Sequence, residues 1–342
     1  MSDTQQPRVL IAGAGAMGIV SSYHLALSGA AVTFLVRPHR VDAVERPQRL
    51  YCYDDGALKA YEGYELISDP ATLSPGAYDY VVITLDGAAM RDPDGERLAR
   101  AIGRVARGTS TGVILGALGI ELRSWFLSVS ELLGEQVTNG TLGIQCHPVA
   151  GVTLPLHAPT DADLLAQADF AYRHCWPLGF SVDDSAPGVA QRFAALYSAN
   201  GISRCVIEQA DEKAAGVFAF FAQMAACDIG GWPSPADIDP DSDFWQLGIA
   251  AGLEIQGLGI FGEAGRKART QTTAEGALQF WRGWERDMLP LDLQGFNRFH
   301  HGGKVNRQDL QILADCIAQG EAEGTPMTAT RELHARQAAL KG

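Results

Sequence analysis

A short motif near the start of the chain limits the folds that are open to it. Residues 8–12, "RVLIA", form an apolar run that leads into "GAGAMG", in which Gly13, Gly15 and Gly18 follow the pattern Gly-x-Gly-x-x-Gly. Apolar residues then recur at helical spacing as far as Leu27, and "AAVTFLVR" returns to a strand pattern. A strand, a glycine turn, a helix and a strand in this order predict a βαβ unit, and therefore a parallel sheet.

The rest of the first half continues this alternation. Strand-like runs follow at 78–85, "YDYVVITL", and at 111–118, "TGVILGAL", with helical stretches between them. We therefore predict an α/β fold with an N-terminal Rossmann-type parallel sheet domain over residues 1–208, covered by helices on both faces. Residues 209–342 are dominated by apolar helical patterns such as the stripe through Trp281. They predict an all-α C-terminal domain.

Composition and net charge limit the classes of molecule that the protein is expected to bind. The formal net charge of -13 repels nucleic acid and anionic lipid, and no apolar run approaches the roughly 20 residues that span a bilayer. The six cysteines are dispersed without a Cys-x-x-Cys pair, which predicts buried, reduced thiols. We expect a soluble, cytoplasmic protein that acts on a small molecule, with no nucleic acid or membrane partner.

The three glycines are typical of a loop that holds a phosphate group. Such a loop needs a tight turn, a backbone that approaches the pyrophosphate and a helix packed close to the strand, and each need is met by a glycine. The helix N-terminus then faces the anion with the amides of Ala16 and Met17. Leu85 and Gly116, at the ends of the next two strand patterns, are predicted to line the same dinucleotide site. The alternative is a glycine turn that binds no nucleotide.

The end of the second strand indicates which dinucleotide is bound. NAD sites place Asp or Glu there to accept from the ribose 2′-hydroxyl, whereas "VTFLVRPHR" has Arg37, 19 residues after Gly18. A guanidinium suits a 2′-phosphate, and Arg40 and His39 can assist. We predict NADPH in preference to NADH. The alternative is that Arg37 is an exposed loop cation and that NADH is the cofactor.

With this glycine motif, the arginine after the second strand, the "DP" ahead of "YDYVVITL", the "GEAEGTPM" stretch and a helical second half, the chain resembles the ketopantoate reductase family. The resemblance covers nearly the whole chain and is most specific in residues 8–40. It implies a Rossmann-type domain and a helical domain with the substrate in the cleft between them. Family members reduce a 2-keto acid with NADPH, and a lysine in the first long helix of the second domain protonates the carbonyl oxygen.

The sequence departs from the family at the positions that the resemblance assigns to catalysis. The family's catalytic lysine falls near Phe218, and the closest lysine, Lys213, is more than one helical turn away. The family's substrate-binding glutamate falls near Arg307 or Gln308, and the nearest acidic residue there is Asp309. Ketopantoate itself is therefore not the expected substrate.

Three residues are candidates for the proton chemistry. His301 in "RFHHGGKVNRQD" is suited to proton transfer at neutral pH, and Lys304 gains a useful pKa if it is partly buried. Asp86 stands where the family usually has a lysine, and it can orient a histidine or hold a cationic imine or amine. Their alternatives are a structural histidine, a solvated cation and a turn or cap residue. No metal site is expected, because His300 and His301 are adjacent and no carboxylate or thiol has ligand spacing.

The chain is therefore predicted to be an NADPH-dependent oxidoreductase of the ketopantoate reductase type. Its expected substrate is a small ketone, 2-keto acid or imine other than ketopantoate. Two alternatives stay open: an opine-type dehydrogenase that joins a keto acid and an amine, and a sensor that binds NADP(H) without turnover. Glycine-spaced apolar helices in the second half are compatible with a homodimer.

Overall fold

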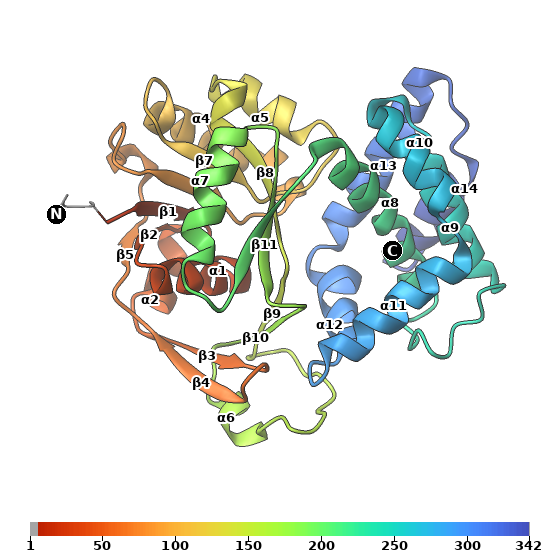
Figure 1. The fold of residues 1–342 in the computed structure, drawn as a ribbon, viewed down its shortest axis with the longest axis horizontal. Coiled ribbons are helices and arrows are strands. Elements are labelled where there is room, and N and C mark those ends of the chain that lie inside the picture. The colour runs from red at the N-terminus through yellow and green to blue at the C-terminus, as the bar shows by residue number, and fades with distance from the viewer. Residues whose placement is uncertain (1–5, 342) are drawn as a thin grey trace. The chain divides into compact units, whose positions relative to one another are not determined.

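Two units make up the chain, Met1–Glu208 and Gln209–Gly342, in a computed structural model that describes residues 6–341. The first unit is built on two β-sheets with helices around them, and the described part of the second unit contains only helices (Figure 1). Within residues 6–341, no helix is both long and apolar enough to cross a membrane. The α/β class and the helical second half that the sequence predicts are confirmed.

An eight-stranded sheet forms the centre of the first unit, with the order β12-β11-β8-β7-β6-β1-β2-β5. The strands from β8 to β5 in this order are parallel, whereas β11 runs antiparallel to β8 and parallel to β12. The predicted parallel sheet is therefore confirmed for six strands, and the other two extend it with one reversal of direction. The strands are β1 (Arg8–Ala12), β2 (Ala31–Leu35), β5 (Glu65–Ile67), β6 (Tyr80–Ile83), β7 (Gly112–Leu115), β8 (Val137–Leu142), β11 (Leu178–Asp183) and β12 (Arg204–Glu208).

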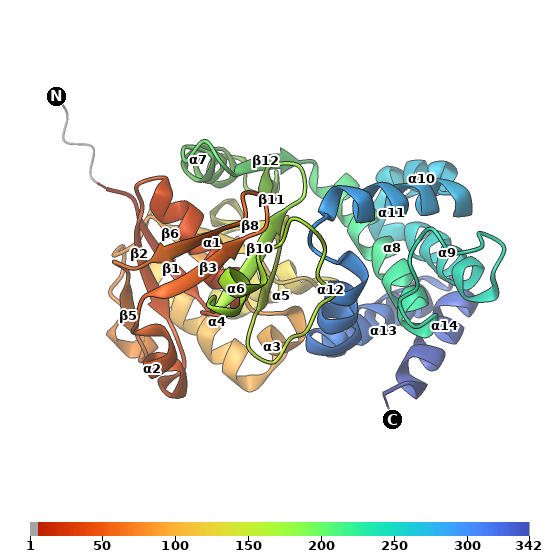
Figure 2. The same cartoon turned by 90° about the horizontal axis from the view of Figure 1, so that it is seen from below.

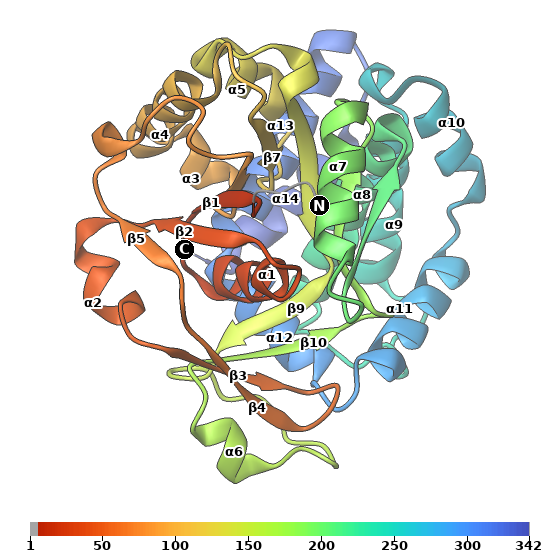
Figure 3. The same ribbon diagram turned by 60° about the vertical axis from the view of Figure 1, so that its left-hand side comes forward.

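Both faces of this sheet are buried, which explains why its strands are continuously apolar instead of alternating. In β1, Val9 and Ile11 pack into one hydrophobic cluster, whereas Leu10 and Ala12 pack into another. Figure 3 shows the helices around the sheet. The first cluster includes residues of α1 (Ala16–Leu27) and α7 (Pro187–Ser198); the second includes residues of α3 (Gly87–Arg91), α4 (Pro93–Ala106) and α5 (Leu122–Ser130).

A second, four-stranded sheet packs against α1 in the first unit (Figures 2 and 3). Its order is β4-β3-β10-β9, with the strands β3 (Gln48–Cys52), β4 (Ala57–Tyr61), β9 (Ile144–Pro148) and β10 (Phe170–His174). The short helices α2 (Val41–Val44) and α6 (Ala162–Ala166) lie in the connections beside it. His24 of α1 is fully buried against this sheet, where its ring contacts Tyr172 and His174. The sequence predicts one parallel sheet in this unit and does not predict this second sheet.

The helical unit is arranged around α8 (Ala210–Ile229), which packs against α9, α10, α13 and α14. Gly248 of α9 allows this close packing, because a Cβ there would lie 2.5 Å from Cβ of Ala226 in α8. Trp281 and Met288 are fully buried, so the predicted core stripe of α11 is confirmed. All six cysteines of the chain are buried and free, as predicted. The other helices are α9 (Asp243–Gln256), α10 (Gly262–Gln271), α11 (Ala274–Met288), α12 (Leu293–Phe299), α13 (Asn306–Glu323) and α14 (Thr328–Ala339).

Candidate active site

The three glycines of the turn between β1 and α1 have different structural roles. Gly13 adopts a φ of +110°, which side-chain-bearing residues rarely adopt. Gly18 faces the turn itself, since a Cβ there would lie 2.1 Å from the carbonyl oxygen of Gly13. Gly15 is exposed, and no atom lies within 4 Å of the position that its Cβ would take. Two glycines therefore allow the turn to close on the helix, and Gly15 leaves its outer side open.

The N-terminus of α1 offers unsatisfied amides beside this opening. Gly15 is the N-cap residue and gives no side-chain cap, and the first helical hydrogen bond runs from the amide of Ile19 to the carbonyl of Gly15. The amides of Ala16, Met17 and Gly18 therefore have no acceptor within the helix. The first turn carries no acidic residue, so nothing in it opposes an anion at the positive end of the helix dipole.

The ends of the neighbouring parallel strands lie beside the glycine turn. The amide of Gly13 donates to the carbonyl of Leu35, the last residue of β2, at 3.1 Å. On the other side, the hydroxyl of Thr84 donates to the carbonyl of Gly13 at 3.1 Å. The amide of Gly116 donates to the carbonyl of Ile83 in the same way, at 3.0 Å. The structure thus brings the predicted turn and Gly116 to one edge of the sheet, where open α/β sheets bind ligands.

A group of cationic side chains follows β2 at this edge. Arg37 comes two residues after the end of β2, and the 3-10 turn Pro38–Arg40 continues from it. Arg37, His39 and Arg40 are all exposed, and within the described residues none of the three forms an ion pair. The sequence predicts Arg37 and Arg40 as phosphate ligands, and the structure leaves both available for that role.

Leu85 and Asp86 follow β6 at the same edge. Leu85 is half-buried, and Asp86 is the N-cap residue of α3, where its Oδ1 accepts a hydrogen bond from the amide of Ala89 at 2.7 Å. The cap role that the sequence left as an alternative for Asp86 is therefore present. A catalytic role for this carboxylate stays a prediction.

A π-helical turn, His300–Lys304, carries the other predicted residues in the helical unit. Nδ1 of His301 lies 2.8 Å from Oδ2 of Asp309 in α13. The ring of His300 instead stacks on Phe296, and burial lowers the pKa of His300 well below its ordinary value. Lys304 is exposed, so the solvated cation that the sequence left as its alternative is present. A catalytic role for this lysine stays a prediction.

A buried carboxylate lies behind this turn, with hydrogen-bond partners that the sequence did not predict. Asp228, near the end of α8, is 7% exposed and accepts hydrogen bonds from side chains on several elements. The donors are Nε1 of Trp232 at 3.0 Å, Nδ2 of Asn306 at 3.4 Å, Nε2 of Gln337 at 3.3 Å and Nζ of Lys341 at 3.3 Å. Trp232 is four residues from Asp228, but Asn306, Gln337 and Lys341 are 78 or more residues away, and no local spacing indicates that these three meet it. The cluster fixes the ends of α8 and α14 and the start of α13 around the π-helical turn.

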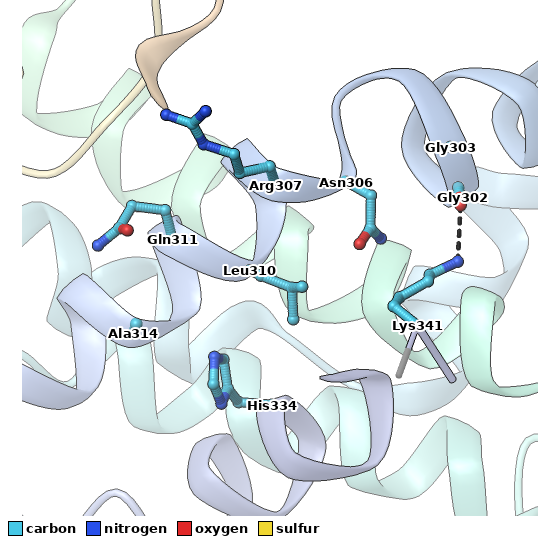
Figure 4. A pocket seen from close by; sticks show the side chains of 9 residues that line it. All are labelled: Gly302, Gly303, Asn306, Arg307, Leu310, Gln311, Ala314, His334 and Lys341. Carbon is cyan, nitrogen blue, oxygen red and sulfur yellow. Dashed lines mark hydrogen bonds between the residues drawn. The ribbon is translucent and has the colours of Figure 1, made fainter. Parts of the chain in front are cut away.

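A cavity of about 540 Å³ lies beside the same turn (Figure 4). Its lining includes the cationic side chains Arg307 and Lys341 and the ring of His334. Lys341 is already engaged, since its Nζ donates to the carbonyl of Gly302 at 2.6 Å and lies 3.1 Å from Asp228. Arg307 also has interactions of its own. The cavity therefore offers no uncommitted cationic group that would assign it to an anionic ligand.

Strand order and the glycine turn together define the class of fold. The order β8-β7-β6-β1-β2-β5, with α1 starting at Gly-x-Gly-x-x-Gly, is that of a Rossmann-type dinucleotide-binding sheet. Residues 9–100 match the family model of the ketopantoate reductase PanE/ApbA. The matched residues lie within the first unit, and the resemblance seen in the sequence is confirmed. No curated protein is significantly similar to the chain in sequence.

Solved structures share the fold of the whole chain. A candidate ketopantoate reductase from Ralstonia solanacearum MolK2 is 17% identical, with a TM-score of 0.70 and 98% of each chain covered. A 2-dehydropantoate 2-reductase from Geobacter metallireducens GS-15 is 17% identical, with a TM-score of 0.65 over 97% of this chain and 99% of the other. A D-mandelate dehydrogenase solved with NADH and anilino(oxo)acetate is 13% identical, with a TM-score of 0.62 over 97% of each chain. At these identities the similarity establishes the ketopantoate reductase fold.

Proposed function

We propose that this protein is an NADPH-dependent oxidoreductase that reduces a small ketone, 2-oxo acid or imine. The observation that carries the proposal is the juxtaposition of the open glycine turn with the exposed group of Arg37, His39 and Arg40. The turn suits a pyrophosphate, and two guanidinium groups next to it suit a 2′-phosphate. One solved structure of the same fold is a D-mandelate dehydrogenase with NADH bound, which supports a nicotinamide dinucleotide as the cofactor, while the choice of NADPH rests on Arg37 and Arg40.

Each group of residues at this edge of the sheet has a proposed role in binding the cofactor. The amides of Ala16 and Met17 and the backbone of Gly15 would hold the pyrophosphate, and Arg37 and Arg40 would hold the 2′-phosphate. Residues after β6 and β7, including Leu85 and Gly116, would line the nicotinamide side of the site, and bound NADPH would supply the hydride. Thr84 would position the glycine turn for the cofactor, because its hydroxyl donates to the carbonyls of Ala12 and Gly13 at 3.1 Å.

The substrate is proposed to differ from ketopantoate. The only lysine of α8 is Lys213, in its first turn, and the middle of the helix is apolar through Phe220 and Phe221. The region around Arg307 likewise lacks a glutamate. The D-mandelate dehydrogenase relative was solved with anilino(oxo)acetate, a 2-oxo acid derivative with a bulky substituent. Bulky 2-oxo acids are therefore the first class to test, followed by ketones and cyclic imines.

Calorimetric titration with NADPH and NADH tests the cofactor assignment. We expect NADPH to bind at least ten-fold more tightly, and Arg37→Ala to weaken NADPH about ten- to a hundred-fold, the loss expected for one charge-assisted hydrogen bond. NADH affinity should stay unchanged in the variant. Arg104→Ala, which removes an exposed arginine from the last turn of α4, is the matched control. Tighter binding of NADH to the unaltered protein would contradict the assignment.

Oxidation of NADPH in the presence of a substrate panel tests the reaction. Turnover with a single carbonyl or imine compound is the expected result. Oxidation that requires a keto acid and an amine together would instead indicate an opine-type dehydrogenase. Tight NADPH binding with no oxidation across the panel would indicate a sensor and overturn the proposed reaction.

A further inference from the structure

We propose that Tyr64, Gln48 and Asp169 are positioning residues for coenzyme selection, which hold residues 37–46 in the conformation that receives the 2′-phosphate of NADPH. Residues 37–46, called the arginine segment below, follow β2 and end shortly before β3. The inference rests on the proposed function and gives the four-stranded sheet a role in it. All the contacts that carry it lie within the first unit.

The start of the arginine segment is fixed by the main sheet. The amide of Val36, directly after β2, donates to the carbonyl of Ile67, the last residue of β5, at 2.9 Å. The amide of Arg40 donates to the carbonyl of Arg37 at 2.8 Å, and the short helix α2 continues from there. The segment is therefore locally helical, and its direction depends on how its far end is held.

Tyr64, which lies between β4 and β5, holds this far end. Its hydroxyl lies 2.8 Å from the carbonyl oxygens of both Val44 and Arg46, which share its single proton. The ring of Tyr64 is itself fixed, because it packs perpendicular to Phe34 of β2, with 5.0 Å between the centroids, and contacts Tyr61 of β4 at 4.9 Å. Tyr64 thus joins the arginine segment to both sheets of the unit.

Gln48 and Asp169 add contacts from the second sheet. Gln48, the first residue of β3, is buried, and its Nε2 donates to the carbonyls of Ala43 at 3.2 Å and Arg46 at 2.8 Å. Asp169 directly precedes β10 and accepts two hydrogen bonds from the guanidinium of Arg46, one of them at 2.9 Å. The side chain of Arg46 is 56% exposed, so solvent screens this ion pair. The buried contacts of Gln48 are therefore expected to contribute more.

The part of the segment that carries the cations is not fixed by packing. The 3-10 turn Pro38–Arg40 has no buried side chain, and Arg37 and Arg40 form no ion pair with any other described residue. Two like charges three positions apart repel each other, so without a phosphate group the two side chains favour separation. A segment of this kind binds an anion tightly when its conformation is held in advance, because less ordering is then required on binding. The contacts of the far end supply that restraint.

The restraint acts on the two coenzymes differently. If the arginine segment holds its binding conformation for only a fraction of the time, the affinity for NADPH falls in proportion to that fraction. NADH has a hydroxyl group in place of the 2′-phosphate and gains little from the two arginines, so its affinity should stay the same. Lost selectivity at constant NADH affinity therefore distinguishes positioning of the segment from a general loss of stability.

Calorimetric titration of the full chain with NADPH and with NADH tests the inference. Tyr64→Phe keeps the ring and removes the hydroxyl, and it should raise the Kd for NADPH about three- to ten-fold, the loss expected for one hydrogen bond, with the Kd for NADH unchanged. Adding Gln48→Met should extend the loss to about ten- to a hundred-fold. Asp169→Asn should have the smallest effect, because the ion pair that it weakens is exposed.

Tyr78→Phe is the matched control. It removes the hydroxyl of another half-buried tyrosine of the first unit, which lies ahead of β6 and outside the arginine segment. Neither coenzyme should change its affinity in this variant.

Hydrogen exchange of the free protein measures the restraint itself. The amides of residues 41–46 should exchange faster in Tyr64→Phe than in the unaltered protein, while those of β1 stay the same. Unchanged exchange, an unchanged ratio of the two Kd values in the Tyr64→Phe and Gln48→Met double variant, or an equal loss for both coenzymes would overturn the inference. An unaltered protein that binds NADH as tightly as NADPH would instead refute the proposed cofactor assignment, so the two failures are distinguishable.

Discussion

Gly15, the exposed glycine of the turn, allows the cofactor site to be tested without a change in folding stability. Gly15 has φ −82° and ψ −176°, which any residue adopts, and its Cβ position is empty to 4 Å. Gly15→Ala should therefore leave the free energy of unfolding unchanged within ~0.5 kcal/mol. The added methyl group would stand where a pyrophosphate approaches, so NADPH affinity should fall at least ten-fold in calorimetry. Unchanged affinity would place the phosphates elsewhere.

Gly18 should show the opposite result. A Cβ there would lie 2.1 Å from the carbonyl oxygen of Gly13 and 2.9 Å from Oγ1 of Thr84. Gly18→Ala must displace the turn or the helix, and overpacking of this kind costs ~1 to 3 kcal/mol. Urea unfolding without cofactor should therefore show a lower midpoint for Gly18→Ala than for Gly15→Ala. A midpoint equal to that of the unaltered protein would contradict the close contact of turn and helix.

His24 makes the stability of the first unit sensitive to acid. Burial lowers its pKa from 6.5 to about 4. Between these values the unfolded chain binds the proton and the folded chain does not, so stability is full above pH 6.5 and is lost as the pH falls toward 4. The free energy of unfolding that is lost over this pH range is about 3 kcal/mol. Urea midpoints at pH 7 and pH 5 should differ less in His24→Gln than in the exposed control His39→Gln; equal differences would refute this origin.

At the scale of elements, the contacts of Lys341 stabilise the π-helical turn. Lys341 donates to the carbonyl of Gly302 and pairs with Asp228, whose side chain is 6% exposed. Lys341→Met removes both interactions and leaves a buried carboxylate with neutral donors only. The free energy of unfolding of the helical unit should fall by about 1 to 2 kcal/mol, a value below that of a fully buried pair because Lys341 is itself partly exposed.

The control for this prediction is an exposed ion pair of the same unit. Lys267 lies 2.8 Å from Glu212, and both side chains are at least half exposed. Lys267→Met should leave the urea midpoint unchanged, because solvent screens such pairs. Equal loss in both variants would indicate a general charge effect and not a specific role of the Asp228 cluster.

Sequence reasoning succeeded where the contacts are local. The turn from Gly13 to Gly18 and the position of Arg37 follow from the order of residues along one βαβ unit, and the structure places them together. It did not predict that Asp309 meets His301, because that pairing depends on the π-helical turn between them.

The long-range contacts could not be predicted from the sequence. Gln337 is 109 residues from Asp228, and no periodicity connects them. The four-stranded sheet is a similar case, because β3 pairs with β10 across more than a hundred residues. The choice of partner strand depends on tertiary packing, which the residue pattern of a single strand does not determine.

At the scale of the whole molecule, the two units should respond differently to the cofactor. NADPH at a hundred times its Kd stabilises the state that binds it by ~2.7 kcal/mol. Hydrogen exchange should slow most in the first turn of α1 and after β2, within Met1–Glu208, and least in the core helices of Gln209–Gly342. Equal protection of α8 and α1 would contradict a cofactor site formed at the sheet edge of the first unit.

The exposed position of Arg37, His39 and Arg40 has a consequence for how this protein can change. The three side chains form no ion pairs within the described chain, so replacing them removes no ion pair that holds the fold together. The glycine turn is instead held by one backbone hydrogen bond, from the amide of Gly13 to the carbonyl of Leu35, and by the hydroxyl of Thr84, which donates to the carbonyl of Gly13. If these residues set the coenzyme preference as proposed, a few substitutions could redirect it without a compensating change elsewhere in the fold.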